Sequence, residues 1–130
     1  MSAYPTAPRA GDGEKRRRAF RRGRKGEFLA MLLLRLKGYR ILARSFRVPM
    51  GEVDIVARRR QVLAFVEVKS RDSHAAAIEA VTPRQQQRIA RAAAAFLGRH
   101  PHYQFHTLRF DIIVVCRRRW PRHLVNAWSA

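Results

Sequence analysis

Four charged side chains in residues 51–69 have types and spacing that could bind a metal ion. Two runs in this stretch alternate apolar with polar residues around a polar break, which is typical of a hairpin of two strands. If the connecting loop has two or four residues, Asp54 lies opposite Glu67 and Glu52 lies opposite Lys69. All four side chains then leave the same face, because residues i and i+2 of a strand share a face.

The opposed carboxylates of Asp54 and Glu67 need a compensating charge. Directly opposed Cβ atoms are roughly 4.5–5.5 Å apart, and like charges in that position destabilise a hairpin. A divalent cation would compensate, since Mg²⁺ takes oxygen ligands from one or two carboxylates together with a substrate phosphate. The opposite face is uniformly apolar and is expected to pack on a helix; it holds Val53, Ile55, Ala57, Ala64, Val66 and Val68. A loop of odd length would break this register.

The alternative is an ordinary solvated strand face with a surface pair between Glu67 and Lys69. The composition favours the metal site. Residues 26–130 contain seven carboxylates, and three of them fall on one face of this hairpin. One of the four lysines of the chain stands close to Glu67, although arginines number 24. We therefore interpret Asp54, Glu67 and Lys69 as the centre of a metal-dependent site.

The same residues carry a family resemblance. Asp54 followed by Glu67-Val68-Lys69 resembles the D…(D/E)-x-K signature of the restriction-endonuclease-like, or PD-(D/E)XK, nuclease superfamily. Most of residues 23–128 also resembles one branch of it, the uncharacterised bacterial YraN-like family. The matching stretches include Gly23-Arg24-Lys25-Gly26-Glu27, Gly38-Tyr39-Arg40-Ile41-Leu42, Gly51-Glu52-Val53-Asp54, Phe65-Val66-Glu67-Val68-Lys69-Ser70-Arg71 and Arg109-Phe110-Asp111. Ser45 and Gln85 depart from that family, which usually has Asn at the first position and commonly Lys at the second.

The resemblance implies an αβββαβ core, with a mixed β-sheet and packed helices, and a nuclease that cleaves DNA or RNA with Mg²⁺ or Mn²⁺. It implies that Asp54 and Glu67 hold the metal, with the Val68 carbonyl as a further ligand. It implies that Lys69 orients the attacking water or stabilises the developing charge. The alternative function is a non-catalytic nucleic-acid-binding protein with the same fold, and a weaker one is an assembly protein on structured RNA.

Glu27 and Glu52 are the accessory carboxylates of this prediction, and they could shape the site or assist a second ion. Glu27 stands in the first turns of a helix predicted over residues 24–37, which Gly38 ends in the left-handed C′ position. The positive end of that helix favours an anion, so a dipole partner is the other interpretation of Glu27. Large apolar residues cover most of the circumference of this helix, which predicts deep burial: Phe28, Leu29, Met31, Leu32, Leu33 and Leu36.

A second helix has clear start and stop signals. Thr82 suits the N-cap, Pro83 suits the first helical position, and Gln85 completes a capping box. Gly98 is predicted to end the helix. Its buried stripe at helical spacing consists of Ile89, Ala92, Ala93, Phe96 and Leu97. Residues 71–80, which precede it, are predicted to form a loop.

The remaining strands complete an α/β fold. Strands are predicted over residues 39–48 and 108–116, with a short edge strand over 123–127. The second strand of the hairpin, the second helix and the strand at 108–116 form a βαβ crossover, so these two strands can run parallel. Asp111 interrupts its strand and is interpreted as structural. The histidines that fit no metal spacing are interpreted as surface residues: His100, His102, His106 and His123.

The formal net charge of +19 indicates a polyanionic partner. Residues 1–25 carry nine basic and two acidic residues, and the remainder of the chain keeps +12. A GC-rich genome could explain why Arg outnumbers Lys but not why acidic residues are so few, so nucleic acid is favoured over a merely basic surface. Nucleic-acid contacts are predicted for Arg24, Lys25, Arg71, Arg84 and Arg88.

Length and composition restrict the class of protein. A chain of 130 residues predicts one domain, here an endonuclease-like domain over residues 23–130 preceded by a disordered basic arm over residues 1–22. The longest apolar run, residues 28–34, is far below the roughly 18 residues that span a bilayer. The N-terminus lacks the apolar segment of a secretory signal, and the single Cys116 cannot form an internal disulfide. A cytoplasmic protein is expected.

Overall fold

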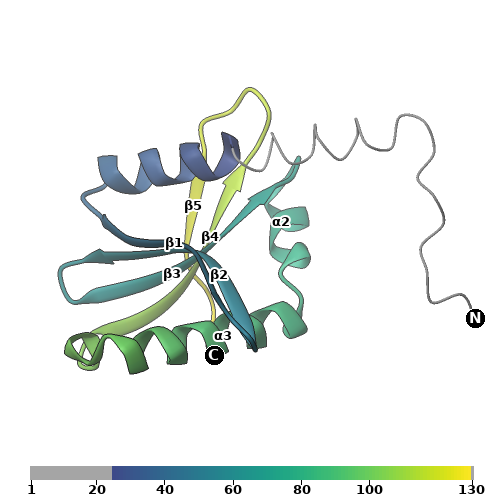
Figure 1. Cartoon of the computed structure of the whole chain (residues 1–130). Coiled ribbons are helices and arrows are strands. Elements are labelled where there is room, and N and C mark those ends of the chain that lie inside the picture. Colours follow the sequence, from purple (N-terminus) through teal and green to yellow (C-terminus); the bar gives the residue numbers. More distant parts are fainter. Residues whose placement is uncertain (1–24, 130) are drawn as a thin grey trace, which may run out of the picture.

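A computed structural model describes residues 25–129, in which one five-stranded sheet separates two layers of helices (Figure 1). The sheet order is β1-β2-β3-β4-β5. The strands are β1 (Arg40–Val48), β2 (Gly51–Arg59), β3 (Val62–Ser70), β4 (Thr107–Val115) and β5 (Arg122–Trp128). The predicted basic arm, residues 1–22, and the predicted contact residue Arg24 lie outside the described residues.

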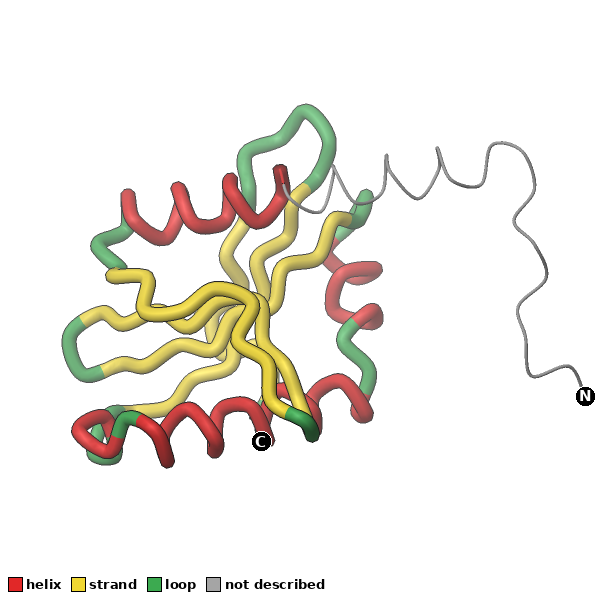
Figure 2. The backbone as a smooth tube through the Cα atoms, viewed as in Figure 1, coloured by secondary structure: helices red, strands yellow, loops and turns green. Residues whose placement is uncertain are grey.

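Helices cover both faces of the sheet (Figure 2). A first helix over residues 25–36 packs on one face, and α3 (Pro83–Arg99) packs on the other. A short helix, α2 (His74–Ala80), and a 3₁₀ turn, η1 (Pro101–Tyr103), flank α3. β3 and β4 run parallel, and the other neighbouring strands run antiparallel. The predicted α/β class with an αβββαβ core is therefore confirmed, with α2 and β5 added to it.

The prediction of a loop over residues 71–80 is wrong, because α2 occupies most of it. The Ser73 hydroxyl accepts a 3.1 Å hydrogen bond from the Ala76 amide and caps the helix. Three alanines follow in the sequence His-Ala-Ala-Ala-Ile-Glu-Ala, and alanine has the highest intrinsic helix propensity. The high helix propensity of these alanines and the Ser73 cap therefore favour a helix, although a run of small residues was predicted to form a loop.

The first helix ends as its glycine predicts. Gly38 has φ of +89°, its amide bonds to the Arg35 carbonyl at 3.0 Å, and the Tyr39 amide bonds to the Leu34 carbonyl at 2.9 Å. This pair of bonds is a Schellman motif, which a side chain at position 38 would strain. The motif turns the chain directly into β1.

Sheet contact covers only one side of the first helix, so the prediction that this helix is deeply buried is wrong. Buried positions include Ala30 and Leu34, which are fully covered. The opposite stripe is exposed, with relative exposures of 61% for Phe28, 37% for Leu32 and 67% for Leu36. Apolar residues around most of a helix do not bury it unless other elements pack on each side. In residues 25–129 only the sheet packs on this helix.

The start of α3 is predicted correctly and its end is not. The Thr82 hydroxyl accepts a 3.2 Å bond from the Gln85 amide, and Pro83 occupies the first turn. The reciprocal half of the capping box is not formed, since the Gln85 side chain bonds to Glu67 instead. The helix continues through Gly98 to Arg99, because a glycine inside a helix costs only about 1 kcal/mol relative to alanine.

α3 approaches β2 so closely that only glycine fits between them. A Cβ atom on Gly51 would lie 2.0 Å from the Arg88 carbonyl oxygen. The second turn of α3, at Arg88, is thereby held close to the first residue of β2. This packing of α3 on β2 places the N-terminal turn of α3, which carries Gln85, beside the acidic residues of the hairpin.

The apolar residues of the hairpin divide between two cores. Five of the six that were predicted to share a face belong to, or pack against, the cluster under the first helix: Ile55, Ala57, Ala64, Val66 and Val68. Val53 instead joins the cluster under α3, so the prediction is wrong for this residue. It pairs with Phe46 of β1, whose ring packs edge-on against Phe96 of α3.

Candidate functional site

The acidic residues meet where β2 and β3 separate. The ladder between these strands runs from Arg59 opposite Val62 to Ile55 opposite Val66 around a two-residue turn, which is the even loop length that the predicted register requires. Beyond the last pair, Asp54 Oδ2 accepts a 2.8 Å hydrogen bond from the Val68 amide. The Asp54 side chain thus accepts the Val68 N–H, which could otherwise bond to the β2 backbone and continue the β2–β3 ladder.

A cleft of about 470 Å³ opens at this separation. Its walls come from the first helix, from β1, from the adjoining ends of β2 and β3, and from the first turn of α3. The lining residues are Glu27, Arg47, Glu52, Asp54, Glu67, Val68, Lys69, Ser70, Arg71 and Gln85. The structure therefore brings together all the residues that were predicted as catalytic, metal-binding or accessory.

Glu67 is the most buried charged residue of this cleft, with 4% relative exposure. Burial and the carboxyl group of Asp54, which lies within hydrogen-bond reach, raise the pKa of Glu67 to about 9. Lys69 Nζ lies 3.8 Å from Glu67 Oε2 and is itself largely buried. Two carboxyl groups and one ammonium group thus face one another in a partly dry site.

Gln85 is a site residue that the sequence analysis missed. Its Nε2 atom donates a hydrogen bond to Glu67 Oε2 from the first turn of α3. The helix-start signals at Thr82 and Pro83 fix where this side chain stands along the chain, but only the packing of α3 on β2 directs it into the cleft. The family resemblance could have indicated a role for this position, because the family commonly has a lysine there.

Glu27 faces the same cleft from the first helix. Burial, followed by the nearby Asp54 carboxylate, raises the pKa of Glu27 above its usual value. Within residues 25–129, no three His, Cys, Asp or Glu side chains gather closely enough to form a ready-made metal cluster. The candidate donors are instead the two carboxyl groups of Asp54 and Glu67, with Val68 beside them in the lining. Such a set suits an ion such as Mg²⁺ that completes its coordination with water and phosphate oxygens.

Glu52 lies at the rim and does not pair with Lys69. Its carboxylate lies 3.3 Å from Arg47 Nε and 3.9 Å from Arg88 Nη2, and about half of its side chain is exposed. The strands have separated before this position, so β1 rather than β3 provides its partner at Arg47. Glu52 therefore holds two arginines at the cleft mouth.

The predicted basic contacts are dispersed. Arg71 lines the acidic cleft and also a second groove of about 850 Å³, which Lys25 lines as well. Arg88 is held by Glu52. Arg84 is exposed in the first turn of α3 and lines neither cleft.

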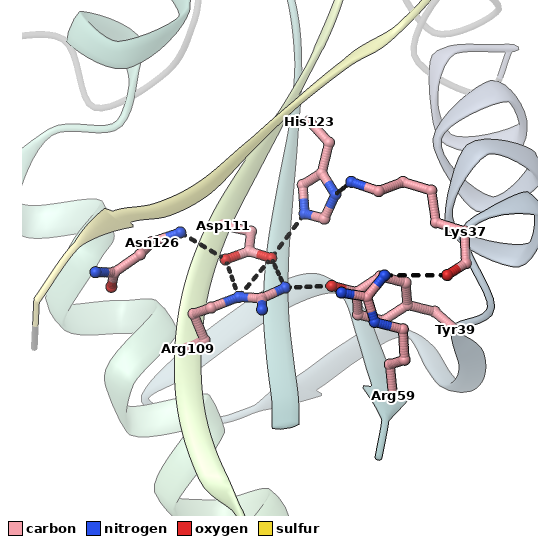
Figure 3. Close-up of polar contacts among 7 residues, drawn as sticks. All are labelled: Lys37, Tyr39, Arg59, Arg109, Asp111, His123 and Asn126. Carbon is pink, nitrogen blue, oxygen red and sulfur yellow. Dashed lines mark hydrogen bonds and ion pairs between the residues drawn. The ribbon is translucent and has the colours of Figure 1, made fainter. Parts of the chain in front are cut away.

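Asp111 belongs to a separate buried cluster (Figure 3). Its Oδ1 atom accepts bonds from Arg109 Nε and the Asn126 amide, each at 2.9 Å, and its Oδ2 atom accepts from Arg109 Nη2 at 2.8 Å. His123 Nε2 lies 2.7 Å from the same Oδ2 atom. Burial alone would raise the pKa of Asp111, but these hydrogen bonds hold it below its usual value.

This cluster holds the C-terminal end of the first helix to the sheet. Lys37 Nζ lies 2.6 Å from His123 Nδ1, and Arg59 donates a 3.1 Å bond to the Lys37 carbonyl (Figure 3). The Arg59 guanidinium also stacks 4.7 Å above the ring of Tyr39. The side chain of His123 is 2% exposed, so its interpretation as a surface residue is wrong. The sequence pattern did not predict this burial, because His123 lies in an edge strand.

No helix in residues 25–129 is long and apolar enough to cross a bilayer. The chain is 53% identical over 124 residues to a UPF0102 protein of Parvibaculum lavamentivorans, an alignment covering 95% of this chain and 93% of that relative. It is 52% identical over 129 residues to a UPF0102 protein of Bradyrhizobium sp. (strain BTAi1 / ATCC BAA-1182), covering 99% and 93% of the two chains.

A family model matches the chain over most of its described length. The match covers residues 26–115 and corresponds to the family described as "Uncharacterised protein family UPF0102". This range contains the first helix, the hairpin with the acidic cleft, α3 and β4. The chain therefore belongs to the uncharacterised family UPF0102, the YraN family that its sequence motifs resemble.

Proposed function

We propose that this protein is a metal-dependent nuclease that hydrolyses phosphodiester bonds of DNA or RNA. The observation that carries the proposal is the meeting of Asp54 and Glu67 from two separating strands in one cleft, with Lys69 3.8 Å from Glu67. Two carboxyl groups held this close are unfavourable without a proton or cation between them. The local energetics and the resemblance to the nuclease signature thus support the same chemistry.

The metal-binding atoms of the proposal are the carboxylates of Asp54 and Glu67 and the Val68 carbonyl. A bound Mg²⁺ or Mn²⁺ would lower the pKa of a water molecule and offset negative charge on the phosphate. The Val68 amide occupies one acceptor position of Asp54 Oδ2, so this bond leaves Oδ1 and the second lone pair of Oδ2 for a ligand. The same bond fixes the orientation of the peptide between Glu67 and Val68.

Lys69 and Gln85 have distinct roles in this proposal. The Lys69 ammonium group lies in the cleft, where it can orient a water molecule or stabilise charge that develops on the phosphate. Gln85 donates to Glu67 Oε2 and so orients that carboxylate toward Asp54. Glu27 adds negative charge on the far wall, where it can help retain a cation.

The surroundings of the cleft suit a polyanion. Arg47 and Arg71 line it beside Lys69, and the whole chain carries a formal charge of +19. Such an excess steers nucleic acid to the surface in a salt-dependent way. A protein that only binds nucleic acid would use these cations but would not require the buried carboxyl pair.

Cleavage assays test the proposal. Protein stripped with EDTA is incubated with end-labelled DNA and RNA, single-stranded and duplex, in Mg²⁺, Mn²⁺ or EDTA. We expect cleavage with metal only, and its loss in Glu67→Gln. Glu79→Gln removes an exposed carboxylate of α2 and serves as the matched control, which should cleave normally. Full metal-dependent cleavage by Glu67→Gln would refute the proposed assignment.

A further inference from the structure

A second, larger groove lies next to the acidic cleft. Its volume is about 850 Å³, and it lies between the start of the first helix, the end of β3 and the loop that joins β4 to β5. Figure 1 shows this loop standing above the sheet beside the N-terminal end of the first helix. The charged residues that line it are Lys25, Arg71, Asp72, Arg117, Arg118 and Arg119.

Cationic side chains dominate the lining of this groove. Five of its lining side chains are cationic and one is acidic. Within residues 25–129, none of the five cations lies in an ion pair with a carboxylate; the pairs that exist involve other basic residues. Five cations gathered in a concave surface around one carboxylate favour a polyanionic ligand more than an ordinary solvated face does.

An exposed aromatic residue follows the three arginines. Trp120 comes directly after Arg119 in the β4–β5 loop, and its relative exposure is 64%. Its ring is therefore accessible to a ligand. Beside cations that can track a phosphate backbone, such a ring stacks on an unpaired nucleobase. A base in a duplex is already stacked and paired, so this chemistry selects a single strand.

The groove adjoins the acidic cleft. Ser70 and Arg71 line both, at the point where β3 ends. The Cys116 thiol donates a 3.0 Å bond to the Arg71 carbonyl, which fixes this junction to the end of β4. Gly26 lets the first helix approach Ser70, since a Cβ atom there would lie 3.0 Å from the Ser70 hydroxyl.

We propose that the groove binds a single-stranded segment of nucleic acid and leads it into the acidic cleft. Arg117 and Arg119 contact its phosphates, and Trp120 stacks on one of its bases. The substrate class of the proposed nuclease is then a strand with an unpaired portion. This deepens and rests on the function proposed for the cleft, whereas the binding itself requires no catalysis.

Fluorescence anisotropy in EDTA tests this binding, with a labelled oligothymidine and a blunt hairpin duplex of equal phosphate number. Arg117→Gln/Arg119→Gln is compared with a charge-matched control at the far end of the sheet, Arg40→Gln/Arg60→Asn. Arg60 has φ of +54°, which asparagine tolerates. Circular dichroism verifies that each variant is folded.

We expect the groove variant to bind oligothymidine at least tenfold more weakly than the control. Its log–log salt slope should fall by about 1.4, for two phosphate contacts on a single strand. Trp120→Ala should weaken single-strand binding roughly 5- to 150-fold, with Trp120→Phe close to wild type and duplex binding unchanged. Quenching of tryptophan fluorescence by oligothymidine should also decrease in Trp120→Phe.

Two outcomes would overturn the proposal: equal binding by the groove variant and the control, or an equal effect of Trp120→Ala on duplex and single strand.

The outcome of this binding experiment can be distinguished from the outcome of the cleavage assay. Groove-dependent binding by a protein that cleaves nothing would refute only the proposed nuclease activity. Glu67-dependent cleavage with binding indifferent to Arg117, Arg119 and Trp120 would refute only the groove.

Discussion

The Asp54 carboxylate accepts a 2.8 Å hydrogen bond from the Val68 amide at the point where β2 and β3 separate. This single contact positions the acidic site, because it anchors Asp54 against the residue that follows Glu67. It also explains why the ladder stops at Ile55 and Val66. The free energy of unfolding, the pH dependence and the metal response should all depend on the carboxyl pair that it holds together.

Asp54→Asn should stabilise the protein slightly in EDTA and reduce its response to metal. Asparagine keeps an oxygen that can accept the Val68 amide but removes a charge that helps to raise the pKa of Glu67, so the folded protein loses part of the cost of keeping Glu67 protonated. A cation that binds only the folded protein adds about 2.7 kcal/mol to its stability at one hundred times Kd. Thermal melts in EDTA and in Mn²⁺ measure both effects. Equal metal-induced shifts in wild type and Asp54→Asn would argue against the site.

The raised pKa of Glu67 predicts that stability falls as pH rises. The folded protein keeps this proton up to a pKa of about 9, whereas the unfolded chain releases it near 4.5. Between these values the native state binds more protons, so raising the pH favours unfolding. Denaturant unfolding in EDTA at pH 5.5 and pH 8 should show this decline in wild type and a weaker one in Glu67→Gln. Identical pH slopes in the two proteins would contradict it.

The Asp111 cluster predicts a large stability loss when its carboxylate is removed. Asp111→Ala leaves Arg109 and His123 without their buried partner, and breaking a buried ion pair costs about 3–5 kcal/mol. Asp72→Ala, which removes an exposed aspartate, should have little effect. The pKa of Asp111 is depressed, so its contribution is present above the unfolded value and is lost as pH falls through the folded value. A loss below 1 kcal/mol at neutral pH would disprove this role.

Two glycine substitutions should change stability in opposite directions. Gly51→Ala places a methyl group 2.0 Å from the Arg88 carbonyl oxygen and should cost about 1–3 kcal/mol by overpacking. Gly98→Ala meets nothing within 4 Å inside α3 and should stabilise by roughly 0.5–1 kcal/mol. Urea denaturation measures both. Gly51→Ala should additionally lower the activity of the proposed nuclease, because α3 carries Gln85.

Alternation of apolar residues and helix-capping residues predicted those parts of the fold that depend on residues close together in the sequence. Alternation predicted the hairpin register, which is confirmed for the pairs from Ile55–Val66 to Arg59–Val62. Gly38 and Thr82 predicted one helix end and one helix start, since each acts through bonds within a few residues. The acidic residues were placed together because strand geometry fixes which side chains share a face.

Residues whose position depends on packing between distant elements could not be predicted. Val53 joins the core under α3, where its partner Phe46 of β1 also packs. Gln85 enters the cleft because α3 rests on Gly51, and His123 is buried because Asp111 of the neighbouring strand binds it. Each outcome depends on a contact across the sheet that periodicity along one segment does not encode.

Binding of Mn²⁺, followed by electron paramagnetic resonance at pH 7.5 with oligothymidine present, tests the central claim most directly. The site formed by Asp54 and Glu67 predicts that wild type and Glu79→Gln remove Mn²⁺ from the free-ion signal at a defined stoichiometry. Glu67→Gln should bind at least tenfold more weakly, because it loses a charged ligand. Equal Mn²⁺ binding by wild type and Glu67→Gln would contradict a metal site at this carboxyl pair.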